Sequence, residues 1–173
     1  AIDAAGISIS DDTTVIEAWN AEHGAANYPL IALALNVEGE SAMSAQLLGI
    51  TLSVGNECAE STLYIPVRDT INRSVAAAVS HIIAQDGRVV LGAMIKRDIT
   101  ILRRHGIDMQ DNYYDIAIAH YLLRPEGSQM LADIAAEMLQ VHIPDWGVPV
   151  QTLRRGIKGD DAQTAARMAS RTD

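Results

Sequence analysis

Apolar residues gather in short continuous runs in the first part of the chain. Residues 30–35, 47–54 and 62–67 form three such runs, each with the length and the Leu, Ile and Val content of a β-strand. A continuous apolar run is typical of a strand buried on both faces. Three strands in close succession predict an antiparallel meander. Ahead of them, Asp12 and Thr13 precede an apolar stretch as an N-cap precedes a helix, so a short helix is expected there.

From residue 70 onward the spacing of apolar residues changes to that of amphipathic helices. A short strand is expected at residues 88–92, and another just before residue 115. Strands followed by helices that alternate with short strands predict a mixed sheet with helices on its faces, in the α/β class. Residues 142–159 are rich in Pro and Gly and predict a long loop. The expected helices span residues 70–84, 95–102, 115–123, 128–140 and 160–171.

Length and composition favour a single globular domain. The chain has 173 residues, of which 49% are hydrophobic, and this is enough to bury a core without disulfide or metal staples. We expect a lead-in helix region over residues 1–28 and the main domain over residues 29–173. The chain begins with Ala1 rather than Met and ends abruptly at Asp173, as expected for a domain of a longer polypeptide.

The charge and the cysteine content argue against several classes of protein. A net charge of −9 disfavours a protein that holds nucleic acid by bulk charge, because phosphate binding favours a basic surface. An acidic pocket can still hold metal ions that face the phosphates. Cys58 is the only cysteine, so the chain has neither an intrachain disulfide nor a cysteine-based zinc site, and a reducing cytoplasm is expected. No apolar segment approaches the roughly 18 residues of a membrane helix.

Two polar segments stand out at the ends of predicted elements. Asn36 and Glu38 follow the first apolar strand, and strand alternation places both on the same face. Burying a polar pair is costly, so such a pair needs partners or a function. The plain alternative is a strand that runs out into a polar loop. Asp98 lies near the start of a predicted helix, where a carboxylate is stabilised electrostatically, and there the plain alternative is an acidic residue that faces solvent.

Taken in order, segments across residues 29–141 resemble the 3′–5′ exonuclease domain of bacterial DNA polymerase I, a family A polymerase, which belongs to the ribonuclease D-like DEDD exonucleases. The family's first motif is a strand reading Leu-Asp-Thr-Glu-Thr, and residues 35–39 read Leu-Asn-Val-Glu-Gly. Its second motif, Gly-x-Asn-x-Lys-x-Asp, is matched by Gly92, Lys96 and Asp98. Further similar segments are Ala45-Gln46-Leu47-Leu48-Gly49-Ile50, Tyr64-Ile65-Pro66, Tyr114-Asp115, Ala119-His120-Tyr121-Leu122-Leu123 and Met130-Leu131-Ala132-Asp133-Ile134-Ala135.

The resemblance implies a ribonuclease H-like mixed sheet flanked by helices, with three antiparallel strands first and parallel strands after them. It also implies a site in which four carboxylates hold two Mg²⁺ or Mn²⁺ ions, which clamp the attacking and leaving oxygens of the cleaved ester. In this chain the resemblance assigns Glu38 and Asp98 as catalytic residues and metal ligands. It places Asn36 where the family has an aspartate. A neutral amide offers no charge and is a poor replacement for a bridging carboxylate.

Two further departures weaken the expected site. Met94 stands in place of the asparagine of the second motif. The third motif, a tyrosine followed four residues later by an aspartate, is not recognisable. Met168 and Thr172 stand near its positions, and Asp173 would serve only with a shift of register. Two carboxylates bind one metal ion weakly at best, so a vestigial site and a fold that is stable without metal are expected.

Three functions are compatible with these residues. The first is an inactive 3′–5′ exonuclease-like domain of a family A DNA polymerase, a protein of DNA replication and repair, packed beside the polymerase domain of the same chain. The second is an active proofreading exonuclease that removes nucleotides from DNA 3′ ends, with Mg²⁺ or Mn²⁺ on Glu38 and Asp98. The third is a free-standing module of this fold that binds single-stranded nucleic acid or a protein. The sequence leaves open whether the chain is an enzyme, and whether Asp173, Asp115 or Asp133 completes the site.

Overall fold

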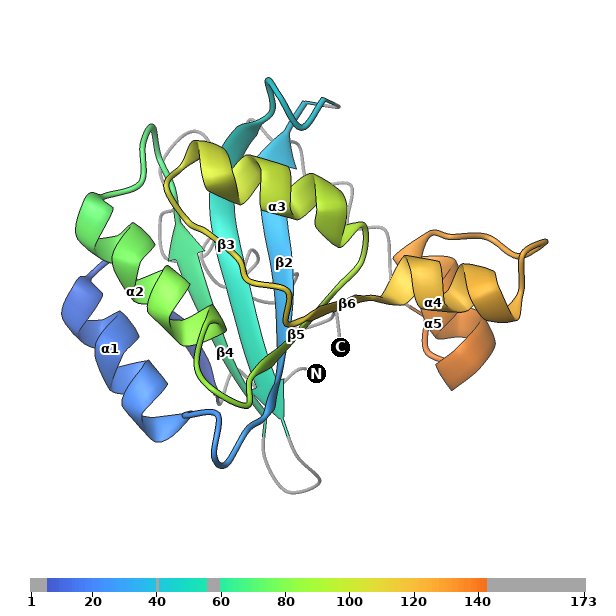
Figure 1. The fold of residues 1–173 in the computed structure, drawn as a ribbon, viewed down its shortest axis with the longest axis horizontal. Helices are drawn as coiled ribbons and strands as arrows, with labels where there is room; N and C mark the ends of the chain where they lie inside the picture. The colour runs from blue at the N-terminus through green and yellow to red at the C-terminus, as the bar shows by residue number, and fades with distance from the viewer. Residues whose placement is uncertain (1–5, 40, 56–59, 143–173) are drawn as a thin grey trace.

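A six-stranded sheet forms the centre of the molecule (Figure 1). The structure is a computed structural model, and it describes residues 6–39, 41–55 and 60–142. The strands are β1 (Ile7–Ile9), β2 (Leu30–Glu38), β3 (Gln46–Gly55), β4 (Glu60–Pro66), β5 (Val89–Gly92) and β6 (Tyr113–Asp115). Their order across the sheet is β1-β4-β3-β2-β5-β6, so β3 and β2 lie in the middle.

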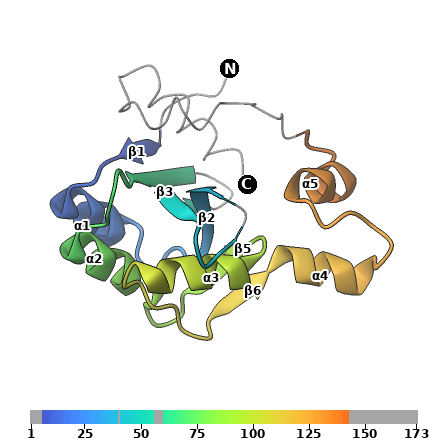
Figure 2. The same ribbon diagram turned by 90° about the horizontal axis from the view of Figure 1, so that it is seen from above.

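The helices of the described residues fall into two groups. They are α1 (Thr13–Glu22), α2 (Arg73–Ile83), α3 (Ile95–Arg104), α4 (Ile116–Leu123) and α5 (Leu131–Leu139). Helices α1, α2 and α3 lie on the same side of the sheet (Figure 2). Helices α4 and α5 form a hairpin that projects beyond the β6 edge of the sheet, as both views show. The molecule therefore consists of a helix-covered sheet with a helical hairpin at one side.

The three long strands form the expected antiparallel meander. Strand β2 pairs with β3, and β3 with β4, in antiparallel fashion. Strand β5 then pairs parallel with β2, and β6 parallel with β5. The predicted α/β fold, with antiparallel strands first and parallel strands after them, is confirmed. The sequence pattern gave no sign of β1, which pairs parallel with β4 and joins the lead-in region to the sheet.

A β-bulge shapes the core beside the carboxyl end of β2. Asn36 and Val37 are neighbours on β2 but pair with residues that are two apart on β3, which leaves Leu48 as an extra residue. The bulge changes the alternation of β3, so that Leu47 and Ile50 both belong to the buried core. A regular strand would place these two side chains on opposite faces. The irregular segment of the sheet is thus the segment that carries the polar end of β2.

Every helix predicted within the described residues is present, with small differences at the first turns. The helix predicted from residue 70 begins at Arg73, because the Asn72 side chain accepts a hydrogen bond from the Ser74 amide at 3.0 Å and acts as the N-cap. None of the helices in these residues is long and apolar enough to cross a membrane. The turn predicted after Gly55, most of the predicted loop at 142–159 and the helix predicted at 160–171 lie outside the described residues.

Candidate functional site

The polar residues selected from the sequence lie at one edge of the sheet. Strands β2 and β5 run parallel, so their carboxyl ends lie at the same edge, and α3 begins shortly after β5. Asp98 lies in the first turn of α3, and Asn36 and Glu38 are at the end of β2. In open α/β sheets this edge is where ligands usually bind. The topology therefore brings the three predicted residues to one region from two elements.

Two arginines attach α3 to the connection between β2 and β3. Arg97 donates from Nη2 to the carbonyl oxygen of Gly39 at 3.3 Å, one residue beyond the end of β2. Arg104, two turns further along the helix, donates from Nη1 to the carbonyl oxygens of Ala42 at 3.0 Å and Ala45 at 2.8 Å. These bonds hold both the first and the last turn of α3 against the segment that follows β2.

Asn36 is hydrogen-bonded to a buried tyrosine. Its side chain pairs with the phenol of Tyr64 on β4, two strands away across the sheet. Gly49 faces Asn36 across the β2–β3 ladder, and a Cβ atom at Gly49 would clash with the Tyr64 phenol oxygen. The phenol ring of Tyr64 therefore occupies the space that a side chain at Gly49 would fill. Burial raises the pKa of Tyr64, and the bond to Asn36 lowers it, so the pair is a packed and uncharged contact at neutral pH.

Asp98 is a buried carboxyl group that folding makes hard to ionise. It is 7% exposed, and within the described residues it forms no hydrogen bond or ion pair. Burial raises the pKa of Asp98 to about 7, the positive charge of Arg97 opposes this rise, and the negative charge of Asp115 adds to it. At neutral pH the group is roughly half protonated.

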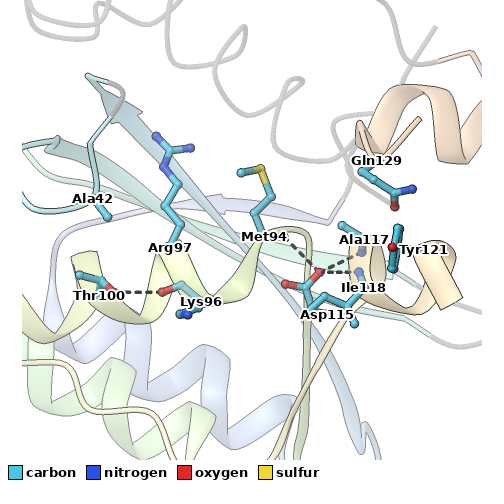
Figure 3. A pocket seen from close by; sticks show the side chains of 10 residues that line it. All are labelled: Ala42, Met94, Lys96, Arg97, Thr100, Asp115, Ala117, Ile118, Tyr121 and Gln129. Atoms are coloured by element: carbon cyan, nitrogen blue, oxygen red, sulfur yellow. Dashed lines mark hydrogen bonds between the residues drawn. The ribbon is translucent and has the colours of Figure 1, made fainter. Parts of the chain in front are cut away.

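Asp115 accepts hydrogen bonds from the first backbone amides of two helices. Its Oδ1 accepts hydrogen bonds from the amides of Ala117 at 2.9 Å and Ile118 at 3.2 Å, as the N-cap of α4. Its Oδ1 also accepts from the amide of Met94 at 3.3 Å (Figure 3), and its Oδ2 accepts from the amide of Ile95 at 2.8 Å. Met94 precedes α3 with a left-handed φ of 59° and offers no side-chain cap. The oxygens of Asp115 are therefore committed to the backbone of α3 and α4.

A cavity of about 570 Å³ lies between α3 and the α4–α5 hairpin (Figure 3). Arg97 and Lys96 contribute positive charge to its wall, while Ile118 and Tyr121 contribute an apolar side from α4. Asn36, Glu38 and Asp98 are not among the residues that line it. The cavity therefore adjoins the three predicted residues through Arg97 rather than containing them.

The residues at this edge do not fit the metal arrangement that the resemblance implies. Among the residues that the structure describes, no group of three or more His, Cys, Asp or Glu side chains is placed to hold a metal ion. Mg²⁺ and Mn²⁺ require several oxygen ligands, and a pair of such ions requires anionic ones. Here Asn36 is a neutral amide bonded to Tyr64, so of the three assigned residues Glu38 and Asp98 supply the carboxylates. Asp173, a further candidate ligand, lies outside the described residues.

Sequence reasoning did not find the roles of Arg97 and Tyr64. Arg97 has the pattern of an ordinary surface charge, and only the packing of α3 reveals its contact with the β2–β3 connection. Tyr64 left a signal, because Gly49 interrupts an apolar strand, and an isolated glycine in a strand indicates that another group approaches closely. Of the carboxylates left open, Asp115 is a helix cap. Asp133, in the first turn of α5, accepts a hydrogen bond at 2.5 Å from Oγ of Ser128, which precedes that helix.

Several solved structures share this fold. The catalytic core of RRP6 from Trypanosoma brucei has a TM-score of 0.70 and 18% identity, over 97% of this chain and 44% of that chain. Escherichia coli RNase D, an exoribonuclease involved in structured RNA processing, has a TM-score of 0.69 and 16% identity, over 95% of this chain and 42% of that chain. Brucella melitensis NrnC with bound Mg²⁺ has a TM-score of 0.67 and 12% identity, over 95% of this chain and 71% of that chain. The chain thus spans less than half the length of the first two, and at these identities the likeness concerns the fold, which is the expected ribonuclease H-like one.

Sequence comparison gives the family. No curated protein matches the chain. A family model described as 3′–5′ exonuclease matches residues 7–145, which is most of the chain and includes the end of β2 and the first turn of α3. By this match, the chain belongs to the 3′–5′ exonuclease family.

Proposed function

We propose that this chain is a 3′–5′ exonuclease-like domain that has lost catalysis and is retained for a structural role. The observation that carries the proposal is Asn36, which stands where the resemblance requires an aspartate and whose amide is bonded to Tyr64. Hydrolysis by two metal ions needs anionic oxygens close to both ions, because their mutual repulsion must be offset. A neutral amide already engaged by a phenol does not supply that charge.

The charges near Asp98 support the same proposal. In an intact site of this type, several anionic ligands share the binding of the ions. Here Asn36 contributes a neutral amide and Arg97 a positive charge beside the carboxylates of Glu38 and Asp98. The nearby carboxylate of Asp115 is bonded to the first amides of α3 and α4.

A nuclease assay tests the loss of catalysis. Single-stranded DNA and RNA labelled at the 5′ end are incubated with the protein and Mg²⁺ or Mn²⁺, and the products are separated by length. RNA is included because one structural neighbour, RNase D, acts in RNA processing. We expect no shortening from the 3′ end beyond that seen with Glu38→Ala. Rapid shortening that a chelator stops and Glu38→Ala abolishes would contradict the proposal and establish an active exonuclease.

We further propose that the domain packs beside a family A polymerase domain of the same cytoplasmic polypeptide. The support is the order of the similar segments across residues 29–141, which follows that of the polymerase-associated exonuclease domain. An antibody raised against the domain provides the test. It should detect, in extracts of the source cells, a polypeptide several times larger than the 18.6 kDa of this chain. A band at 18.6 kDa would support a free-standing module instead.

A further inference from the structure

We propose that the guanidinium group of Arg97 is the resident cation of this site and that it excludes divalent metal ions. The inference rests on the proposed function, which it deepens by naming a second residue, besides Asn36, that opposes metal binding. Arg97 reaches from α3 to the carboxyl end of β2 and donates to Gly39 at 3.3 Å. Gly39 follows Glu38 in the sequence, and the positive charge of Arg97 also acts on Asp98. The charge of Arg97 is therefore placed at the edge of the sheet that carries both positions assigned as metal ligands.

Arginines in the described residues have two kinds of partner. Arg103 pairs with the Asp108 carboxylate at 3.1 Å, and Arg124 pairs with Glu137 at 2.7 Å. Arg97 donates to a neutral carbonyl oxygen, as Arg104 also does, and the Nε atom of Arg97 is buried without a hydrogen-bond partner. A guanidinium group offers five N–H donors and does not lose its charge in proteins. Arg97 therefore carries a positive charge into the site that a carbonyl contact does not cancel.

This charge acts directly against a metal ion. A unit positive charge about 6 Å from a divalent cation weakens its binding by about tenfold even at the dielectric constant of water, and by more in a partly buried site. Arg97 is half-buried, and Asp98 beside it is 7% exposed, so the site is only partly open to solvent. The charge of Arg97 is also felt by Asp98, whose pKa it lowers against the effect of burial. Arg97 thus performs part of the neutralising role that a metal would otherwise have.

Asn36 and Arg97 change the charge of the site in the same direction. Relative to an aspartate at 36 and an uncharged residue at 97, each makes the site more positive by one unit. Restoring the aspartate alone therefore leaves the guanidinium in place. The inference predicts that Asn36→Asp gains little metal affinity by itself and gains much more when Arg97 is also neutralised.

Titration with Mn²⁺ tests this prediction without reference to activity. Electron paramagnetic resonance measures free Mn²⁺ at about pH 8, where Asp98 is mostly ionised. The starting protein is Asn36→Asp, and to it are added Arg97→Met, Arg97→Lys or Arg103→Met. We expect Arg97→Met to raise the affinity for Mn²⁺ by at least about tenfold. Arg97→Lys keeps the charge and should change the affinity by less than about threefold.

Arg103→Met is the matched control. It removes one positive charge from the same helix, but at a position where the arginine is exposed and paired with Asp108. Solvent and salt screen such a charge, so the affinity should change by less than about threefold. An Arg97→Met effect no larger than that of Arg103→Met would overturn the inference. So would a wild-type protein that binds Mn²⁺ at submillimolar concentration through Glu38.

The test separates this inference from the proposed function. Wild-type nuclease activity in the assay above would overturn the loss of catalysis. An inert wild type whose Asn36→Asp form binds Mn²⁺ equally well with or without Arg97 would overturn only the role of Arg97. Thermal melting checks the folding of each variant. Should Arg97→Met fail to fold, Arg97→Gln removes the charge while it keeps an amide donor for Gly39, and the same tenfold rise is expected.

Discussion

Asp98 binds its proton more tightly in the folded chain than in the unfolded one. Burial raises its pKa from 3.8 to about 7. Between these two values the folded state holds a proton that the unfolded state has released, so the free energy of unfolding falls as the pH rises through this range. The contribution of Asp98 to stability is therefore most favourable below about pH 4 and least favourable above about pH 7.

Replacing Asp98 by asparagine removes this dependence. We expect Asp98→Asn to increase the free energy of unfolding by about 1–4 kcal/mol at pH 8 and by less at pH 5, because the amide is never ionised. Urea denaturation of both proteins at the two pH values measures the difference. Asp108→Asn, at an exposed position, is the control and should shift stability by less than about 1 kcal/mol at either pH. Equal effects of Asp98→Asn at the two pH values would contradict the raised pKa.

At the scale of elements, the carboxylate of Asp115 caps the first turns of both α3 and α4. Asp115 accepts hydrogen bonds from two amides at the start of each helix. The left-handed backbone of Met94 carries the chain from β5 into α3, and no side chain of its own caps this helix. The orientation of α3, and with it the position of Asp98, therefore depends on a residue that belongs to the next strand–helix unit.

Asp115→Ala should weaken both helix starts. We expect a loss of about 1–3 kcal/mol in the free energy of unfolding, since an N-cap and further buried amide bonds are lost together. Hydrogen exchange followed by mass spectrometry should show faster exchange in the first turns of α3 and α4 alike. Faster exchange in α4 alone would mean that α3 is held by other contacts, such as those of Arg104. Asp108→Ala provides a surface control of the same type.

The elements were largely predictable from the sequence, and the contacts of the site were not. Continuous apolar runs specify β2, β3 and β4, and helical spacing specifies α2 to α5, because each signal is local. Strand β1 has three residues, too few for a pattern, and forms only because β4 offers it a partner. The sequence placed Asn36 and Glu38 at the end of a strand and Asp98 at the start of a helix, and the sheet topology brings these two places to one edge. The contacts of Tyr64 and Arg97 join segments far apart in the sequence. Gly49 indicates that some group approaches the strand closely, but no local pattern identifies Tyr64 or Asn36 as the partners.

At the scale of the whole molecule, stability comes from the apolar core of the sheet and its covering helices, with Ile16, Ile50 and Ile82 among its buried residues. In the α4–α5 hairpin, Glu137 pairs with Arg124 at 2.7 Å, and its other carboxylate oxygen lies 3.3 Å from Nε2 of the buried His120. On the outside of the hairpin, Leu122 is 76% exposed. None of these described contacts requires a metal ion.

Metal removal should therefore leave the fold unchanged. We expect EDTA to alter the melting temperature of the wild-type protein by less than about 1 °C, and millimolar Mg²⁺ to do the same, because a ligand stabilises a protein only in proportion to its binding. Differential scanning calorimetry in a non-chelating buffer measures both effects. The Asn36→Asp/Arg97→Met protein is the comparison, and Mn²⁺ should raise its melting temperature. A wild-type protein that melts several degrees lower in EDTA would indicate a bound metal and contradict the expectation.

Because Asp115 caps both α3 and α4, a movement of the α4–α5 hairpin is transmitted to the edge of the sheet. A partner that binds the exposed side of α4 and tilts it displaces the carboxylate that also accepts from the first turn of α3. The charges of Arg97 and Asp98 travel with that turn. A neighbouring domain that binds the hairpin would thus change the positions of these two charges without contacting either residue.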